Sequence, residues 1–290
     1  YTAGIPLYDR DNRVAGSAGV ILDITDMHNY QNQLKKALKL EIDLGAMKTR
    51  FVTLASHEFR TPLSIIQANA ELLSIVSTSD ADLHQRKRFK KRISNEINYM
   101  TKLMDEILLY EKISIGAIQT NKTVFSLPCL CSEVLNTINE LKKSGEKVNL
   151  AIHGDSKDVL LDRKLLKRAI ENILSNATKF SKGAPVDFSL YYQQDFLKIA
   201  IVDKGIGVPA EEIKNVFNPF FRGSNIGNIR GAGLGIGIAK EHVLLNGGTL
   251  ELESEPGRGT KVIITFGMEA YSETQEAIKT NAEDNVVLTS

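Results

Sequence analysis

A long hydrophobic repeat in the first third of the chain constrains the fold most. Between Met27 and Leu73, residues of one face recur at alternating steps of three and four, the spacing of a helix that packs against other helices. The first series is Tyr30, Gln33, Ala37, Leu40, Leu44, Met47, Phe51 and Leu54, and the second is Phe59, Leu63, Ile66, Ala70 and Leu73. The second series is displaced by one residue, so we predict one long helix whose buried stripe rotates near residue 57.

A second helical pattern follows the polar break at residues 77–82. Its apolar positions are Ile93, Ile97, Met100, Met104 and Ile107. A single hairpin covers two apolar stripes poorly, so we expect a homodimer in which two helical hairpins form a four-helix bundle. An intramolecular contact with the rest of the chain is the alternative.

The remainder of the chain alternates helical and strand-like segments after an expected linker at residues 113–127. We predict strands at 148–152, 159–161, 186–192, 196–202, 249–253 and 261–266. Helices are predicted at 130–143, 162–180, 210–216 and 234–245, with Asp162 as the N-cap of the second. This order is typical of an α+β sandwich with helices over one face of a mixed sheet. Residues 5–8 and 14–25 are predicted strands, and the polar tail from 268 is predicted to be loosely ordered.

Composition excludes several classes of protein. The formal net charge of +1 gives no general attraction to nucleic acid or anionic membranes, so we expect no nucleic-acid partner. No stretch reaches the roughly 18 apolar residues of a membrane span. Cys129 and Cys131 are expected to be two small apolar residues at a helix start, which fits a reducing, cytoplasmic compartment. Because the chain begins at Tyr1, we expect a fragment, with membrane contact only through a missing N-terminal region.

Residues 56–63, with the sequence Ser-His-Glu-Phe-Arg-Thr-Pro-Leu, carry the first chemical motif. His57 lies about 200° around the helix from Phe59 and faces solvent if Phe59 faces the core. Glu58 is placed to accept the proton of the ring Nδ1, which leaves Nε2 free to attack phosphorus. Taken alone, an exposed helical histidine is ordinary surface.

Four further motifs follow in order along the second half of the chain. Taken alone, the first three have ordinary structural readings, which are a polar helix face, a turn and a small core cluster, and the fourth is only a weak signal. The first is a helical stretch in which Asn172, Asn176 and Lys179 share one face and Phe180 follows. Amide oxygens suit Mg²⁺, and a lysine suits phosphate.

The second motif leaves a strand at Asp203, with Gly205 and Gly207 allowing close backbone approach to a ligand. The third extends from Phe217 to Arg222 and opens a polar loop. The fourth is a glycine-rich helix start that exposes backbone N–H groups to a phosphate. It contains Gly231, Gly233, Leu234 and Gly235.

The octapeptide resembles the phosphoacceptor box of the HisKA histidine kinases, and the other motifs resemble the N, G1, F and G2 boxes of their Bergerat-type (GHKL) ATP-binding domain. The resemblance extends from about residue 40 to 267 and includes a strand start at Thr260. Lys204 and Phe180 depart from the commoner Asn and Tyr, at positions expected to tune affinity. Residues 19–25 also resemble the end of a PAS sensor domain.

The resemblance implies a sensor histidine kinase that uses ATP and Mg²⁺. In that family the histidine is phosphorylated and passes its phosphoryl group to an aspartate of a response-regulator receiver domain. It implies that His57 is the acceptor, that Glu58 assists and that Thr61 serves a phosphatase activity. It further implies that Asn176 holds Mg²⁺ and that Asp203 binds adenine. Nucleotide-binding roles are also implied for Asn172, Lys179, Phe180, Gly205, Gly207, Phe217, Arg222, Gly231, Gly233, Leu234, Gly235 and Thr260, with residues 218–230 as the ATP lid.

Two alternatives remain at this point. ATPases of the same fold activate water with a Glu four residues before the metal-binding Asn, but that position here is Asn172, an amide that is no base. The other is a catalytically silent, nucleotide-sensing dimeric scaffold. The expected domains are a PAS-like remnant (1–26), a signalling coiled coil (27–50), a dimerisation and phosphotransfer domain (51–112), the linker (113–127), the ATP-binding domain (128–267) and a flexible tail (268–290).

Overall fold

The computed structural model describes residues 2–21, 23–76, 82–141, 148–227 and 229–267. Some side chains within these ranges, that of His57 among them, lie outside the description, as does the predicted tail at 268–290. The chain divides into two compact units, Tyr1–His57 and Glu58–Ser290.

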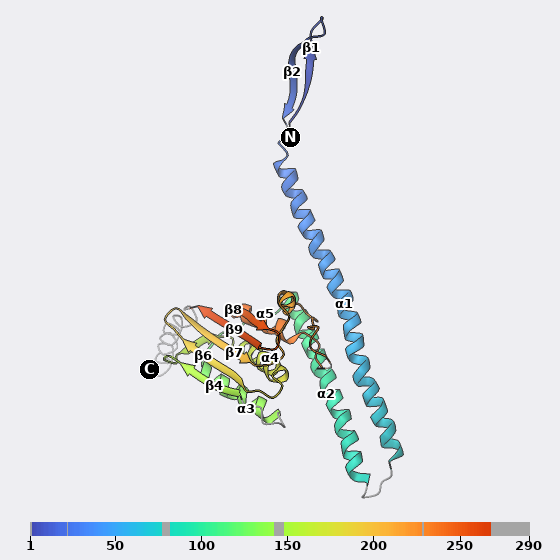
Figure 1. Ribbon diagram of the computed structural model, residues 1–290, viewed down its shortest axis with the longest axis vertical. Helices are drawn as coiled ribbons and strands as arrows, with labels where there is room; N and C mark the ends of the chain where they lie inside the picture. Colours follow the sequence, from blue (N-terminus) through green and yellow to red (C-terminus); the bar gives the residue numbers. More distant parts are fainter. Residues whose placement is uncertain (1, 22, 77–81, 142–147, 228, 268–290) are drawn as a thin grey trace, which may run out of the picture. The chain divides into compact units, whose positions relative to one another are not determined.

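The first unit begins with a β-hairpin. Strands β1 (Thr2–Tyr8) and β2 (Val14–Ile21) pair antiparallel (Figure 1). The Oδ1 of Asp9 accepts hydrogen bonds from the backbone N–H groups of Asp11 and Arg13, both at 2.9 Å. These bonds close the polar turn that the sequence predicts.

Helix α1 (Thr25–Ile75) follows the hairpin directly. The second strand is shorter than predicted because the Oδ1 of Asp23 accepts from the N–H of Thr25 at 2.9 Å, and the helix starts there. The side-chain and backbone hydrogen bonds from Thr25 lower the pKa of Asp23. Pro62 lies inside the helix and is buried, and the helix continues through it.

In the second unit, α1 and helix α2 (Leu83–Ser114) form a helical hairpin whose apolar stripes are only partly covered within the chain. Leu103 of α2 is 3% exposed. Other apolar residues of the hairpin are between 43% and 53% exposed: Leu63, Leu72, Ile97, Met104 and Leu108. The hairpin therefore keeps an apolar surface that the single chain does not bury.

The rest of the second unit is built on a five-stranded sheet in the order β4-β6-β7-β9-β8. The strands are β4 (Val148–His153), β6 (Val186–Tyr192), β7 (Phe196–Asp203), β8 (Thr249–Glu255) and β9 (Gly259–Gly267). Only β4 and β6 pair in parallel, and the other pairs are antiparallel. Burial alternates along β6, as in a sheet with one covered face.

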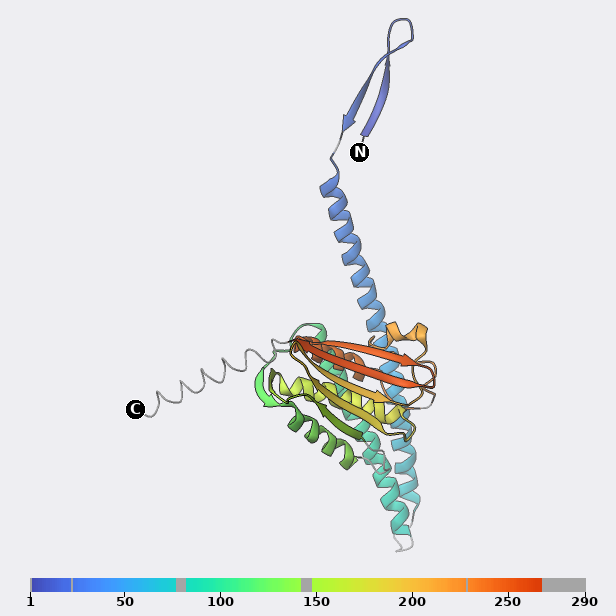
Figure 2. The ribbon, with the colours of Figure 1, turned by 60° about the vertical axis from the view of Figure 1, so that its left-hand side comes forward.

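Helices α3 (Leu127–Leu141), α4 (Arg163–Phe180) and α5 (Gly235–Leu245) lie over that covered face (Figures 1 and 2). Their apolar residues share one core with the inward-facing strand residues, including the fully buried Phe188 and Phe266. The fold class is thus the predicted helical hairpin followed by an α+β sandwich.

Helix α4 starts where the sequence predicts. The Oδ1 of Asp162 accepts hydrogen bonds from the N–H groups of Lys164 at 2.9 Å and Leu165 at 3.0 Å, which confirms Asp162 as the N-cap. Its Oδ2 accepts from the N–H of Asn121 at 2.8 Å. The cap therefore also ties the preceding linker to this domain.

The predicted linker at 113–127 contains a strand. β3 (Thr123–Ser126) pairs antiparallel with β5 (Asp158–Leu161), and α2 extends to Ser114, so only residues 115–122 lack helix or strand. The sequence prediction missed β3. The predicted helix at 210–216 is the short 3₁₀ helix η2 (Ala210–Asn215).

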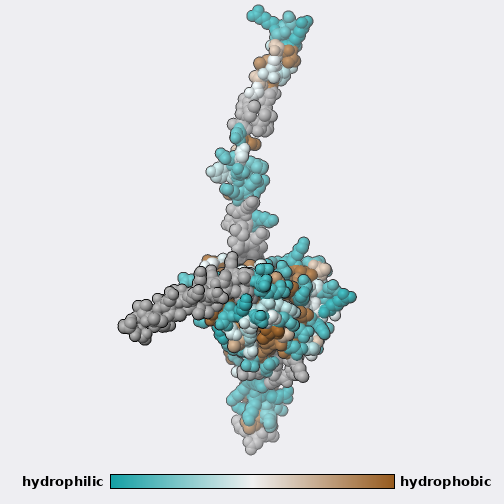
Figure 3. All heavy atoms as spheres, turned by 90° about the vertical axis from the view of Figure 1, so that its left-hand side faces the viewer, coloured by the Kyte–Doolittle hydropathy of each residue, from teal (hydrophilic) through white to brown (hydrophobic). Residues whose placement is uncertain are grey.

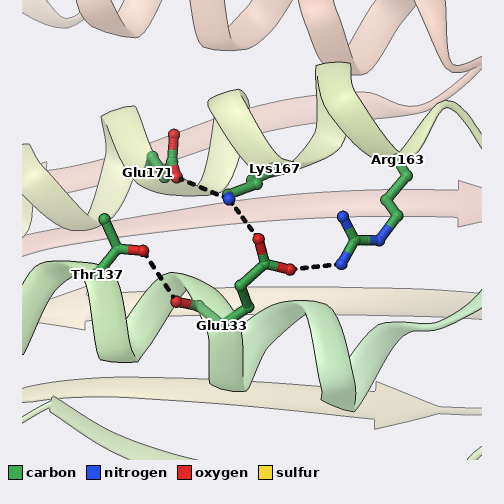
Figure 4. A network of polar contacts seen from close by, with 5 residues as sticks. All are labelled: Glu133, Thr137, Arg163, Lys167 and Glu171. Carbon is green, nitrogen blue, oxygen red and sulfur yellow. Dashed lines mark hydrogen bonds and ion pairs between the residues drawn. The ribbon is translucent and has the colours of Figure 1, made fainter.

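Helices α3 and α4 are joined by a polar network (Figure 4). The carboxylate of Glu133 accepts hydrogen bonds from Lys167 and Arg163, which lower the pKa of that carboxyl. Lys167 also lies 3.8 Å from Glu171. These groups are partly exposed, so the network fixes the relative orientation of the two helices with a modest gain in stability.

The two cysteines and the two isolated histidines of the α+β sandwich have structural placements. Cys131 is buried, which raises the pKa of its thiol to about 12, and Cys129 is exposed; both are free. His242 lies fully buried in α5, and His153 stacks on Tyr191 with ring centroids 4.6 Å apart. Among the described residues, no group of three or more His, Cys, Asp or Glu could hold a metal ion.

The visible surface is mostly hydrophilic. Figure 3 shows hydrophilic residues over most of the face turned to the viewer, with an apolar area within the second unit. In the described part of the chain, no helix has the length and apolar character needed to cross a bilayer.

Candidate functional site

A cavity of about 420 Å³ lies in the second unit. It is lined by α4, by the end of β7, by the loop after Val216, by the start of α5 and by one face of α2. Most of the predicted nucleotide-binding residues line it: Asn172, Asn176, Lys179, Phe180, Asp203, Gly207, Arg222, Gly231, Gly233, Leu234, Gly235 and Thr260. Residues from four separate motifs therefore meet in one place.

One end of the cavity combines a carboxylate with apolar walls. Asp203 is 7% exposed, and burial raises the pKa of its carboxyl, opposed by hydrogen bonds from the N–H groups of Gly205 and Thr260. The apolar walls are Ile201, Ile206, Val216, Leu252 and Val262. A buried acceptor beside apolar walls suits a planar, aromatic group that carries an N–H donor.

The two glycines after Asp203 shape this end. Gly205 is not among the lining residues; a Cβ there would lie 2.2 Å from the carbonyl oxygen of Phe180, and its N–H donates to Asp203 Oδ1 at 2.8 Å. Gly207 has φ +64°, and a Cβ there would lie 1.9 Å from the carbonyl oxygen of Glu255. Gly205 thus holds the carboxylate, while Gly207 lets the turn pack on the adjoining strand.

A second part of the cavity lining is polar and rich in donors. Asn172, Asn176 and Lys179 project from α4, and the start of α5 faces them: a Cβ on Gly235 would lie 3.8 Å from Cγ of Asn172 and 3.9 Å from Nδ2 of Asn176. Leu234, the N-cap residue of α5, makes no side-chain cap hydrogen bond, so the first N–H groups of this helix can serve a ligand.

Lys179 lies against the glycine loop. Its Nζ donates to the carbonyl oxygen of Arg230, and a Cβ on Gly231 would lie 2.7 Å from that Nζ. Burial, together with the positive charges of Arg222 and Lys102, lowers the pKa of Lys179. Positive groups crowded around an open space favour binding of an anion.

Phe217 is not part of the cavity lining, and its nucleotide-binding role stays a prediction. Its ring packs against the core, and Lys240 Nζ lies 4.5 Å from the ring centroid. A Cβ on Gly237 would lie 2.8 Å from the carbonyl oxygen of Phe217. Phe217 therefore anchors the start of the loop on α5.

Helix α2 contributes residues that sequence reasoning missed. Tyr99, Lys102, Leu103 and Glu106 line the cavity. Lys102 lies 3.8 Å from Glu106, and burial raises the pKa of Glu106 against the effect of Lys102 and Lys179. Their spacing at three and four residues indicates that they share one face of α2. No local sequence pattern predicts that the α+β sandwich packs against this face.

The histidine motif lies in α1. His57 is helical, and its side chain lies outside the described residues, so its predicted exposure stays a prediction. Thr61 is exposed one turn further on. Glu58 is half-buried; its Oε1 accepts from Arg222 Nη1 at 3.1 Å and its Oε2 from the hydroxyl of Tyr99 at 2.7 Å.

Known families share both parts of this arrangement. Residues 47–116 match the His Kinase A (phospho-acceptor) domain. Residues 161–270 match the histidine kinase-, DNA gyrase B-, and HSP90-like ATPase. The protein is therefore of the class that joins a phospho-acceptor helical hairpin to an ATP-binding domain. More narrowly, the chain belongs to the sensor histidine kinases, as its curated relatives indicate.

Among these relatives, the sensor histidine kinase WalK of Bacillus subtilis is 27% identical over 269 residues, which cover 91% of this chain and 41% of that protein. The sensor protein EvgS of Escherichia coli O157:H7 is 30% identical over 274 residues, covering 92% of this chain and 22% of that protein. The chain thus spans less than half the length of these two relatives.

Solved structures share the fold. The histidine kinase AdeS of Acinetobacter baumannii has a TM-score of 0.58 at 19% identity, covering 73% of this chain and 98% of that chain. The histidine kinase ThkA, solved in complex with the response regulator protein TrrA, has a TM-score of 0.56 at 21% identity, covering 92% of this chain and 74% of that chain.

Proposed function

We propose that this chain phosphorylates His57 with ATP and passes the phosphoryl group to an aspartate of a response-regulator receiver domain. The observation that carries the proposal is the cavity, with Asp203 at its apolar end and Asn176 and Lys179 at its donor-rich end. Such a polarity matches a purine joined to a chain of phosphates.

Each end of the cavity supplies its own part of the binding. Asp203 accepts a hydrogen bond from the adenine amino group, while the apolar walls contact the faces of the ring. Lys179 and the N–H groups at the start of α5 bind the phosphates. Asn172 and Asn176 line this part of the cavity, and the amide oxygen of Asn176 would hold Mg²⁺ there, which neutralises phosphate charge when bound.

In the transfer, Nε2 of His57 attacks the γ-phosphorus, the bond between that phosphorus and the β,γ-bridging oxygen breaks, and ADP leaves. Glu58 accepts the proton of Nδ1, so the phosphorylated imidazole is neutral. Catalysis consists mainly of positioning and charge stabilisation, as in phosphoryl transfer generally. The phosphoryl group then passes to the aspartate, which regenerates the histidine.

The exposed apolar residues of the hairpin support a homodimer in which two hairpins form a four-helix bundle. The predicted domain plan fits the same proposal, with the ATP-binding domain turning on its linker toward His57. Thr61, on the helix that carries His57, would orient water for dephosphorylation of the regulator.

The test is incubation of the chain with γ-labelled ATP. We expect an acid-labile, base-stable phosphoprotein that is lost in His57→Gln and retained in His84→Gln. His84 is a matched control because it is also a helical histidine, exposed in the first turn of α2. Label that persists in His57→Gln would overturn the proposal.

Water attack is disfavoured because Asn172 stands where related ATPases carry a general base, and it lines the cavity as an amide. We therefore expect ATP turnover to depend on His57. Steady release of phosphate by His57→Gln at the rate of the unmodified chain would instead assign an ordinary ATPase.

A further inference from the structure

Both oxygens of the Glu58 carboxylate are held by donors from other elements. Tyr99 of α2 donates its hydroxyl to Oε2 at 2.7 Å, and Arg222 donates Nη1 to Oε1 at 3.1 Å. The side chain of Glu58 is only 18% exposed. The carboxylate therefore has a defined orientation, set by the packing of α2 against α1 and by the loop after Val216.

Tyr99 is itself fixed by the loop. The guanidinium carbon of Arg230 lies 5.6 Å from the centroid of the Tyr99 ring, a cation–π contact. The same Arg230 donates Nη1 to both carboxylate oxygens of Glu96, at 2.8 and 2.7 Å. Glu96 lies three residues before Tyr99, on the same face of α2. Arg230 therefore contacts the face of the Tyr99 ring, and Glu58 accepts the hydrogen bond of its hydroxyl.

The two donors to Glu58 differ in what else they can do. Arg222 lines the cavity, and its Nη2 also donates to the carbonyl oxygen of Ile229 at 2.8 Å. A guanidinium at that place also serves an anionic ligand in the cavity. Burial, and then the hydrogen bond to Glu58, raise the pKa of Tyr99, so its hydroxyl stays a neutral donor. Tyr99 is therefore the constant partner of Glu58, while Arg222 is shared with the cavity.

We propose that Tyr99 is a positioning residue for phosphorylation of His57: its hydroxyl keeps the Glu58 carboxylate oriented for accepting the imidazole proton. This inference rests on the proposed function. Tyr99 exchanges no proton and forms no bond to substrate in this step. If the Glu58 carboxylate rotates away from this orientation, it accepts the imidazole proton more slowly, although it is still the same base.

The test is Tyr99→Phe in the full 290-residue chain, because this change removes only the hydroxyl and keeps the ring that Arg230 contacts. We expect the rate constant of autophosphorylation at saturating ATP to fall about tenfold, with the KM for ATP changed by less than about twofold. The matched control is Tyr110→Phe, on the same helix, whose ring contacts Phe220 edge-on at 6.5 Å. We expect that control to keep the rate of the unmodified chain.

A double-mutant cycle separates positioning from a general structural role. If Tyr99 acts through Glu58, Tyr99→Phe causes no further loss in a Glu58→Gln background. Glu58→Asp is the second variant; its shorter side chain keeps the charge but withdraws it from Tyr99, and Tyr99→Phe should add nothing there either.

Three results would overturn the inference: an unchanged rate in Tyr99→Phe, a loss confined to KM, or a loss that adds in full to that of Glu58→Gln. Each of these leaves the proposed function standing as long as labelling depends on His57. Labelling that survives His57→Gln would instead remove the proposed function, whatever Tyr99→Phe does.

Discussion

The helical hairpin and the ATP-binding domain of the same chain differ in where their apolar residues go. The domain encloses its own core, in which Phe188, Phe266 and Leu166 are inaccessible to solvent. In the hairpin, Leu103 is buried where it lines the cavity, but Met104, its neighbour in sequence, is 53% exposed. One part is therefore complete as a folding unit, whereas the other requires a second surface.

The largest expected effect is a loss of stability in the ATP-binding domain, which encloses its own core. Phe188→Ala should lower the free energy of unfolding of the ATP-binding domain by about 4 kcal/mol, because it empties a fully buried site in the core. Urea unfolding measures this loss. The control is Leu108→Ala, at a 52% exposed position of the hairpin, which should leave the same domain transition unchanged. Equal losses in both variants would contradict the comparison.

The buried imidazole of His242 makes the stability of the ATP-binding domain depend on pH. His242 is fully buried, and neither ring nitrogen has a hydrogen-bond partner among the described residues; burial, reinforced by Arg168, lowers its pKa to about 4. Between about pH 6.5 and pH 4 the unfolded chain binds the extra proton, so stability falls as the pH falls through this window, by up to about 3 kcal/mol.

The measurement is the free energy of unfolding at several pH values for the unmodified chain and for His242→Gln. The variant loses the titrating group, so the decline between pH 6.5 and pH 4 should be shallower. An identical decline in both proteins would exclude His242 as its cause.

The hairpin is tested by placing a charge on its exposed stripe. Met104→Asp should raise the dissociation constant of the proposed dimer about hundredfold, because association would bury an unpaired carboxylate. Sedimentation at several protein concentrations measures it. Lys90→Asp, at an exposed polar position of α2, is the control. A dimer that tolerates both changes equally would show that this stripe is not the interface.

The smallest effect is expected at the surface network of the domain. Glu133→Ala removes the acceptor of Arg163 and Lys167 and should lower the stability of the domain only slightly, far less than Phe188→Ala, since these charged groups are partly or fully open to solvent. The same unfolding experiment at high salt should reduce the difference further. A loss as large as that in Phe188→Ala would mean that the two helices depend on charge rather than on the core.

The sequence predicted those elements whose pattern is local. The three-four repeat gave both long helices, alternation gave the strands of the main sheet, and Asp162 marked the start of α4. The short β3 was missed because four residues directly before a helix show no period, and its pairing with β5 joins segments about 35 residues apart.

The residues of the candidate site differ in the same respect: some follow from local spacing, and others depend on how distant elements pack. Asn172, Asn176 and Lys179 lie one helical turn apart, so their common face follows from spacing alone, and the structure brings them to one cavity. Tyr99 and Glu106 lie far from every motif, and their place at that cavity depends on how α2 packs. Gly205 and Phe217, whose contact with the nucleotide stays a prediction, pack behind residues that line the cavity.

The junction between α2 and the ATP-binding domain limits how the domain can travel. The N–H of Ala117 donates to the carbonyl oxygen of Lys112 at 2.9 Å, which ties the chain to the end of the helix, and the N–H of Asn121 donates to Asp162 at 2.8 Å. Only residues 118–120 lie between these anchors, and the four steps from Ala117 to Asn121 span about 14 Å at full extension. If the domain turns on this joint, as proposed above, it would rotate along an arc with little free diffusion, so a bound nucleotide would meet a small set of orientations.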